Sequence, residues 1–204
     1  MSELKQTIET NEIEKLDLKA LSRAALLCKS DLMSETVPEF PNLQGIMGYH
    51  YALNDGEGEK VALAIRDHYL PINRHDKLPE TLEGKFLSLA DKLDSLVMLY
   101  IAGERATGSK DPMALRRTAI AIIRLIVEGN LNVNLKDIIS KIYDEFENSV
   151  ETKNEIYKFI NERLIGYIEE EYKYDKKNIQ SVINQMQEQS LENLLLTIKK
   201  ISEL

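Results

Sequence analysis

Long runs of helix-forming residues, with few residues that break helices, restrict the fold of this sequence more than any other feature. The 75 residues from 130 to 204 contain no proline, and charged residues are spread through their apolar runs. Leu, Ile, Ala, Lys and Glu dominate these stretches, and most of them favour helix. Nine glycines and five prolines in 204 residues are few for an all-β protein, and strand patterns are weak throughout. The sequence therefore predicts an all-α fold.

The spacing of apolar residues places the helices. Helices are expected over 16–29, 43–53, 59–68, 82–102, 135–146, 151–171, 176–187 and 191–204, with a helix end and loop over 30–40. The best-marked helix has Asp111 as its N-cap and Pro112 at its first position, and it ends before Gly129. Its apolar face comprises Leu115, Ala119, Ile122, Ile123 and Ile126. The pair Gly45 and Gly48 would allow another backbone to approach closely.

Composition excludes several classes of protein. A single cysteine forms no internal disulfide, which indicates a reducing compartment, and we expect the cytoplasm. No apolar run approaches the roughly 20 residues of a membrane span, and the polar, acidic first residues do not resemble a secretory signal. The net charge of −8 argues against non-specific nucleic-acid binding but leaves room for a local basic stripe.

Polar residues follow a buried helix between Arg23 and Tyr51. Cys28, Lys29 and Asp31 come directly after the apolar run Ala24–Leu27, and a loop with two prolines follows them. Such an arrangement can carry chemistry, bind a ligand or hold the fold together. For the thiol of Cys28, packing in the core is the alternative to a functional role.

Asp91 and Asp94 lie three residues apart on one expected helix, so both carboxylates should point to one side. Carboxylates on an apolar helix need a partner or a metal, and a salt bridge is the plain alternative to a site. None of His50, His68 and His75 is spaced for a zinc motif. We interpret His68 as a cation that stabilises a helix C-terminus and His75–Asp76 as part of a solvated loop.

A basic stripe is expected on the helix after Asp111. Arg117 and Arg124 lie seven residues apart on one face, with Arg116 beside them. The stripe could meet phosphates or pair with acidic residues of the same chain.

Four motifs carry a resemblance to a known family. In order they are RAALLCKSDLMSETVPEFPNLQGIMGYHYAL, AIRDHYLP, LPETLEGKFLSLADKLDSL and ATGSKDPMALRRTAIAIIRLI. Together they resemble the beta subunit of bacterial glycyl-tRNA synthetase, from about Leu21 to Ile126 and more loosely beyond. That subunit is several times longer, so the sequence is expected to correspond to an internal piece of it.

The resemblance implies an HD-domain-like helical bundle followed by a helical extension. Residues 1–13 would be a flexible segment, 14–129 the HD-like domain and 130–204 an extension toward the anticodon-binding region. HD-type phosphohydrolases place a metal-binding His-Asp dyad after an AALL helix, and here Cys28 and Lys29 occupy those positions. Asp91 resembles the Asp that HD-type phosphohydrolases carry on a later helix. Together with Asp31 and Asp94, these residues would form a degenerate form of the HD metal site. We expect no bound metal and no catalytic residue, and we hypothesise that Lys29 pairs with Asp91 or Asp94 in place of the metal.

By resemblance, glycine activation with ATP and Mg belongs to the alpha subunit of an alpha2beta2 complex. This piece alone would be inactive and hold no cofactor. Its partners would be glycine tRNA and the alpha subunit, and the candidate RNA contacts are Arg105, Lys110, Arg116, Arg117 and Arg124. The alternatives are a metal-dependent HD-type phosphohydrolase and a purely structural scaffold for subunit assembly.

Overall fold

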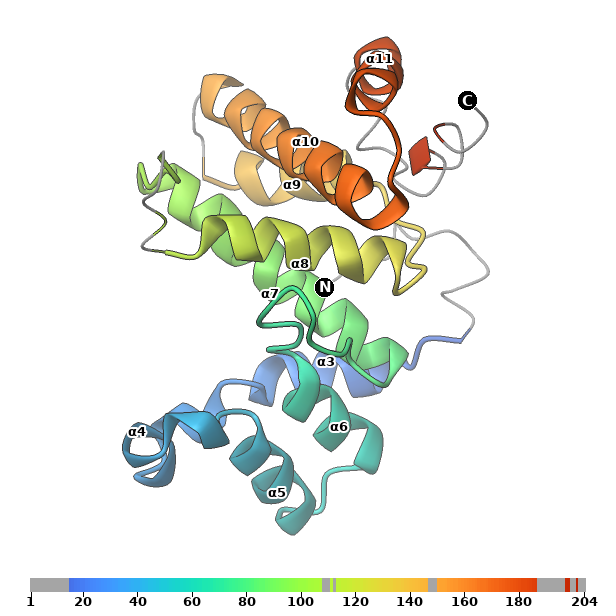
Figure 1. Cartoon of the computed structure of the whole chain (residues 1–204). Helices are drawn as coiled ribbons and strands as arrows, with labels where there is room; N and C mark the ends of the chain where they lie inside the picture. Colours follow the sequence, from blue (N-terminus) through green and yellow to red (C-terminus); the bar gives the residue numbers. More distant parts are fainter. Residues whose placement is uncertain are drawn as a thin grey trace. The chain divides into compact units, whose positions relative to one another are not determined.

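A computed structural model describes residues 15–107, 111, 113–146, 150–186, 197, 198 and 201. Within these residues the regular structure is helical and no strand occurs, which confirms the all-α prediction (Figure 1). The contacts between residues separate two compact units. The N-terminal unit ends at Asp91 and the C-terminal unit begins at Lys92, so the division falls inside helix α7 (Leu82–Ile101).

The N-terminal unit consists of short helices followed by the first half of α7. In chain order they are α3 (Leu18–Leu27), the 3-10 helix η1 (Ser30–Met33), α4 (Thr36–Glu39), the 3-10 helix η2 (Pro41–Leu43), α5 (Ile46–Asn54) and α6 (Glu59–Asp67). Helix α3 begins at Leu18 because the Asp17 carboxylate accepts a hydrogen bond from the Ala20 amide at 3.0 Å. Helix α6 lies against both α3 and α5.

The glycines of α5 fit its close packing on α6. A Cβ atom at Gly45 would lie 2.8 Å from the carbonyl oxygen of Arg66, and one at Gly48 would lie 2.7 Å from the Ile65 side chain. Gly45 also has φ +80°, a conformation that residues with a Cβ atom rarely adopt. The predicted close approach of a backbone is therefore confirmed at Gly45, whereas Gly48 meets a side chain.

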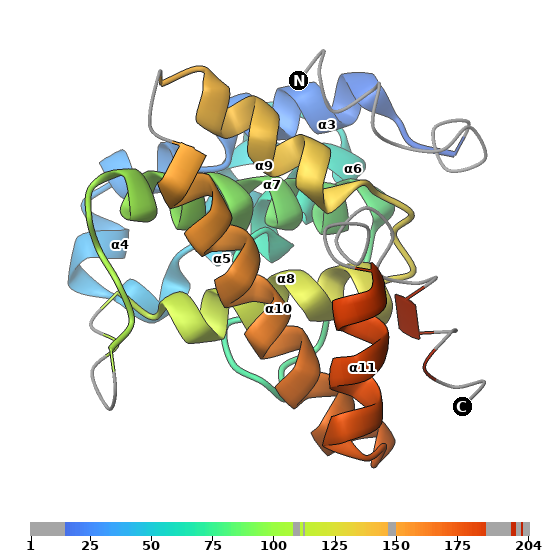
Figure 2. The ribbon, with the colours of Figure 1, turned by 90° about the horizontal axis from the view of Figure 1, so that it is seen from above.

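The C-terminal unit consists of long helices. After α7 come α8 (Leu115–Val127), α9 (Leu135–Asp144), α10 (Val150–Tyr172) and α11 (Lys176–Met186). Helix α10 is the centre of this unit, since it contacts α8, α9 and α11 (Figure 2). The apolar face predicted for α8 is confirmed, because all five of its residues are buried.

The start of α8 differs from the prediction. Asp111 was expected to be the N-cap, but the helix begins at Leu115 and its N-cap is Ala114, which has φ 56°. The Asp111 carboxylate still accepts hydrogen bonds from the amides of Leu115 and Arg116, at 2.8 and 3.0 Å. It therefore satisfies the helix start from outside the helix.

The other expected elements agree with the structure within a few residues, with one exception. The segment 30–40, expected as a helix end and loop, contains η1 and α4. Pro112, the flexible segment 1–13 and most of the expected helix 191–204 lie outside the described residues. The predicted domain boundary at residue 129 differs from the division at Asp91 and stays a prediction. Among the described residues, no helix combines the length and apolar character that a membrane span requires.

Replacing Gly45 with alanine should lower the free energy of unfolding by more than about 2 kcal/mol, because the added methyl group meets a backbone carbonyl in addition to the strain of a positive φ. Urea titrations followed by far-ultraviolet circular dichroism measure this loss. Gly56 provides a matched control, since it has the same φ of +80° and nothing within 4 Å of the added Cβ. Gly56→Ala should cost only about 1 kcal/mol, and equal losses at both positions would contradict the close approach.

Candidate functional site

The ammonium group of Lys29 lies at the centre of the candidate site, in the N-terminal unit. Its Nζ atom lies 2.9 Å from Asp91 Oδ1 and 3.0 Å from His68 Nε2. The same atom lies 4.1 Å from the centre of the Tyr69 ring, within the range of a cation–π interaction. The predicted pairing of Lys29 with Asp91 is therefore confirmed, and the salt-bridge interpretation of this carboxylate is supported.

Lys29 carries a positive charge in this arrangement. Burial lowers the pKa of its ammonium group, but the hydrogen bond and charge of Asp91, with help from Tyr69, raise that pKa above its ordinary value of 10.5. The side chains of Lys29 and Asp91 remain 42% and 24% exposed, so solvent screens part of their attraction. The ion pair is stabilising below pH 10.5 and loses its effect as pH rises through the folded-state pKa.

His68 was interpreted from the sequence as a helix-terminal cation, and that interpretation is wrong. The residue is fully buried, and its Nδ1 atom lies 2.6 Å from the Ile65 carbonyl oxygen, which can only accept. Nδ1 therefore carries a proton, and Nε2 accepts from the ammonium of Lys29, so the ring is neutral. The burial of His68 could have been predicted from the sequence, because His68 follows Val61 and Ile65 at helical spacing and continues their buried face.

Asp31 joins the site to the start of α5. It is 1% exposed, and its Oδ2 atom accepts a 2.6 Å hydrogen bond from the Gly45 amide. That amide belongs to the N-cap of α5, where a carboxylate is favoured by the helix dipole. The other oxygen, Oδ1, has no hydrogen-bond partner among the described residues.

Cys28 occupies the position that core packing predicts. Its side chain is buried, its Sγ atom lies 3.5 Å from the Ala25 carbonyl oxygen, and burial raises the pKa of the thiol. A thiol with a raised pKa is a poor nucleophile at neutral pH.

Asp94 is the last of the predicted site residues. It lies on α7 three residues after Asp91, is exposed, and belongs to the C-terminal unit. In the part of the chain that the structure describes, no group of three or more His, Cys, Asp or Glu side chains is arranged to hold a metal ion.

A second set of ion pairs closes the loop before α7. The guanidinium of Arg66 donates to both carboxylate oxygens of Asp67, at 2.7 and 3.0 Å, and to Glu80 at 2.9 Å. Asp67 also accepts from the Glu80 amide at 3.1 Å. Burial raises the pKa of Asp67, but the Arg66 and Glu80 hydrogen bonds outweigh it and hold that pKa below 3.8.

The basic residues predicted to contact RNA lie in the C-terminal unit. Some of them form ion pairs within that unit, and Arg117 is exposed. Arg124 is buried and donates to Glu128 at 2.6 and 2.8 Å. Arg105 donates to Glu155 and lies over the Tyr100 ring at 4.3 Å. Arg117 is exposed, Arg116 is half-buried, and Lys110 lies outside the described residues. Internal pairing, the alternative to phosphate contact, thus describes Arg105 and Arg124.

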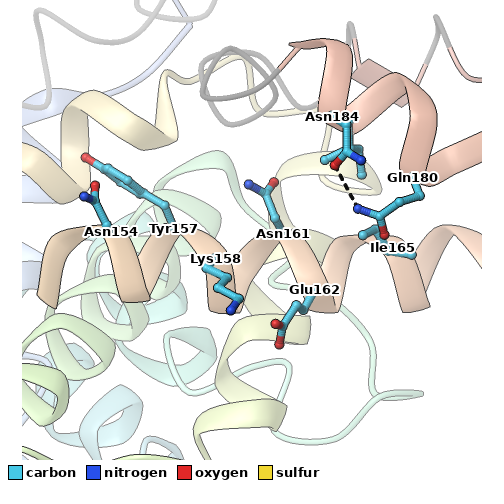
Figure 3. A pocket seen from close by; sticks show the side chains of 9 residues that line it. Asn154, Tyr157, Lys158, Asn161, Glu162, Ile165, Gln180 and Asn184 are labelled. Carbon is cyan, nitrogen blue, oxygen red and sulfur yellow. Dashed lines mark hydrogen bonds between the residues drawn. The ribbon is translucent and has the colours of Figure 1, made fainter. Parts of the chain in front are cut away.

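A groove that the sequence analysis did not identify runs between α10 and α11. Its volume is about 600 Å³, and Figure 3 shows amide side chains on both of its helices. Asn154 and Asn161 come from α10, and Gln180 donates to Asn184 at 2.9 Å on α11. Amides offer both donors and acceptors, so this lining suits hydrogen bonding more than acid–base chemistry.

Comparison with known proteins confirms the resemblance that the motifs indicated. The sequence profile of the family described as "Glycyl-tRNA synthetase beta subunit" matches residues 1–184. The "Glycine--tRNA ligase beta subunit" of Rickettsia canadensis (strain McKiel) is 46% identical over 187 residues, which cover 91% of this chain and 27% of that protein. The protein of the same name from Rickettsia africae (strain ESF-5) is 52% identical over 155 residues, 76% of this chain and 23% of that protein. The chain thus spans about a quarter of the length of these curated relatives.

Removing the ammonium of Lys29 should destabilise the N-terminal unit. We expect Lys29→Ala to lower the free energy of unfolding by about 2 kcal/mol, since the variant leaves the Asp91 carboxylate without its cation. A double-mutant cycle of Lys29→Met with Asp91→Asn should give a coupling of about 1 kcal/mol, a value reduced by solvent exposure. Urea titrations provide both numbers.

The ion pair of Lys60 with Asp17 is the matched control, because its 3.7 Å distance and higher exposure predict a weaker coupling. Equal coupling in the two cycles would contradict a special role for Lys29. Elemental analysis that finds one Mn, Fe or Zn ion per chain would contradict the replacement of a metal by this cation.

The lowered pKa of Asp67 predicts a specific loss of stability in acid. Its contribution is complete above pH 3.8 and is lost as pH falls through the folded-state pKa. Asp67→Asn should therefore destabilise the chain strongly at about pH 6 and much less at about pH 3. Urea midpoints at the two pH values measure the difference, and a loss that is independent of pH would contradict the prediction.

Proposed function

The chain belongs to the glycyl-tRNA synthetase beta subunit family, and from this membership we propose that it is a non-catalytic helical module that supports binding of glycine tRNA and the architecture of the synthetase. The observation that carries the proposal is the family match over residues 1–184. The relatives named glycine--tRNA ligase beta subunit are more than three times as long as this chain, so the ligase activity is assigned to the complete enzyme.

In this proposal the chain itself performs no step of aminoacylation. The alpha subunit supplies the ATP and Mg chemistry in the cytoplasm, and the beta subunit supplies tRNA contacts. The chain alone is then inactive toward glycine and ATP. Its own contribution is to position helices around the tRNA and the alpha subunit.

The Lys29 cluster supports the non-catalytic part of the proposal. Asp91, the carboxylate that resembles a metal ligand of HD-type enzymes, accepts from an ammonium group at 2.9 Å. An ammonium in this place repels a divalent cation and satisfies the charge that the metal would satisfy. In this proposal, the site corresponds to an HD-like centre in which a side-chain cation has replaced the metal.

Arg117 is the best described candidate for an RNA contact. It is exposed in the first turn of α8, next to the half-buried Arg116. Proteins recognise A-form RNA mainly through its shape and its sugar–phosphate backbone. An exposed guanidinium group is well suited to bind a phosphate of that backbone. Because the chain has a net charge of −8, such contacts must be few and local.

A purely structural role is the competing function, and one observation favours it. Arg105 and Arg124, two of the predicted RNA contacts, form ion pairs with Glu155 and Glu128 inside the C-terminal unit. If Arg117 also contributes nothing to RNA binding, the module acts as a spacer or as a contact for the alpha subunit.

Arg117→Ala in the complete synthetase should weaken binding of glycine tRNA severalfold and reduce the slope of affinity against salt by about one ion, as expected for one lost phosphate contact. Filter binding over a range of salt concentrations measures both quantities. Lys19→Ala, which removes an exposed cation from α3, is the control and should leave both unchanged. If Arg117→Ala binds tRNA like the parent at every salt concentration, the structural role is the correct one.

A further inference from the structure

Three tyrosines lie in contact where α10 ends and the chain turns toward α11. The rings of Tyr172 and Tyr174 are stacked, with centroids 6.0 Å apart and an angle of 5° between their planes. Tyr167 meets Tyr172 edge to face at 6.2 Å and 72°. Tyr172 is 39% exposed and Tyr174 is half-buried, so the stacked pair borders solvent.

The innermost tyrosine is buried and is fixed by a hydrogen bond to an exposed carboxylate, that of Glu128. Tyr167 is 2% exposed, and its hydroxyl donates to Glu128 Oε1 at 3.0 Å. The same carboxylate accepts both hydrogen bonds of Arg124. Tyr167 therefore supports the ring of Tyr172, and Tyr172 supports the ring of Tyr174. These contacts fix the orientation of the stacked pair before any ligand binds.

The backbone between the stacked rings is unusual. Lys173 has φ 60°, a left-handed conformation that a lysine rarely adopts. Lys173 is the first residue after α10, where a left-handed conformation commonly ends a helix. The turn at this residue separates Tyr172, the last residue of α10, from Tyr174, whose ring stacks on it.

The charges around the pair are mixed. Lys173, Lys176 and Lys177 are exposed, and so are Glu170 and Glu171 on the last turn of α10. The carboxylate of Asp175 accepts from the amides of Lys177 and Asn178, so it serves the start of α11. A surface of this kind does not attract phosphates in general, and its distinctive property is the aromatic pair.

We propose that Tyr172 and Tyr174 form a stacking platform for an unpaired nucleobase of RNA, with Lys173 beside the adjoining phosphate. Aromatic side chains bind unpaired bases because every base offers a π-face, whereas bases inside a duplex are not accessible to them. The platform differs from the Arg117 contact, which would meet the backbone. The choice of RNA as the ligand rests on the proposed function, since the rings alone would also suit an aromatic residue of a protein.

Fluorescence anisotropy with a labelled, unstructured RNA of about eight nucleotides tests the platform in the full chain at low salt. Tyr174→Ala and Tyr172→Ala should each weaken binding roughly tenfold, as the loss of one stacked base predicts. Tyr174→Phe, which keeps the ring, should bind like the parent. A hairpin of about eight paired nucleotides, closed by a non-nucleotide linker so that no base is unpaired, should bind equally to all variants.

Tyr51→Ala is the matched control, because Tyr51 is 37% exposed on α5 and lies in the other unit. It should bind the single strand like the parent. Thermal melting of each variant shows whether it is folded. If Tyr172→Ala does not fold, Tyr174→Ala still tests the stacking of the base. Lys173→Gly tests the phosphate contact, because it removes the cation while both rings remain, and it should weaken binding of the single strand.

The result that overturns the inference is unchanged single-strand binding in folded Tyr174→Ala, or an equal loss for the hairpin. If glycine tRNA binds the complete synthetase while the tyrosine variants bind both short RNAs like the parent, the platform is wrong and the proposed function stands. If the single strand binds in a tyrosine-dependent way and glycine tRNA does not bind, the proposed tRNA role fails and the platform stands.

Discussion

The polar centre of the N-terminal unit depends on one ammonium group. Lys29 follows α3 directly, and its Nζ atom joins that helix to Asp91 on α7 and to His68 at the end of α6. A half-buried carboxylate and a half-buried cation are both costly alone, and together each satisfies the other. Because an ammonium can only donate, it also fixes His68 as a neutral acceptor. The charges and hydrogen-bonding groups of Lys29, Asp91 and His68 therefore satisfy one another within the chain.

Asp31 extends this constraint from the site to the packing of α5. Its carboxylate holds the Gly45 amide, and Gly45 lies too close to the backbone of α6 for any other residue. The loop between α3 and α5 is therefore tied at both ends, by Lys29 at its start and by Gly45 at its end. The polar residues of this site therefore also stabilise the packing of the unit.

Periodicity was sufficient to predict most helices, because the buried faces of α6 and α8 repeat at helical spacing. It was not sufficient where polar side-chain contacts, near or distant in sequence, decide the outcome. Asp111 was expected to be the N-cap of α8, yet it accepts hydrogen bonds from two amides of α8 while the N-cap is Ala114. Arg124 was placed on a basic stripe that could meet phosphates or pair within the chain, and the structure shows the internal pair with Glu128, whose carboxylate also accepts from Tyr167. The neutral state of His68 depends on Lys29, 39 residues away, and no local pattern carries that information.

The pairing of arginines in the C-terminal unit bears on the proposed role in RNA binding. Arg105 and Arg124 pair with Glu155 and Glu128, and the net charge of −8 weakens any broad electrostatic attraction to phosphates. In the proposed function, affinity then comes from individually placed groups such as Arg117. Interactions that do not depend on net charge, including stacking on aromatic rings, gain relative weight under this constraint. The pair of Arg124 with Glu128 has two effects on this surface: the guanidinium of Arg124 is held by a carboxylate, and the same carboxylate accepts from Tyr167, whose ring contacts Tyr172.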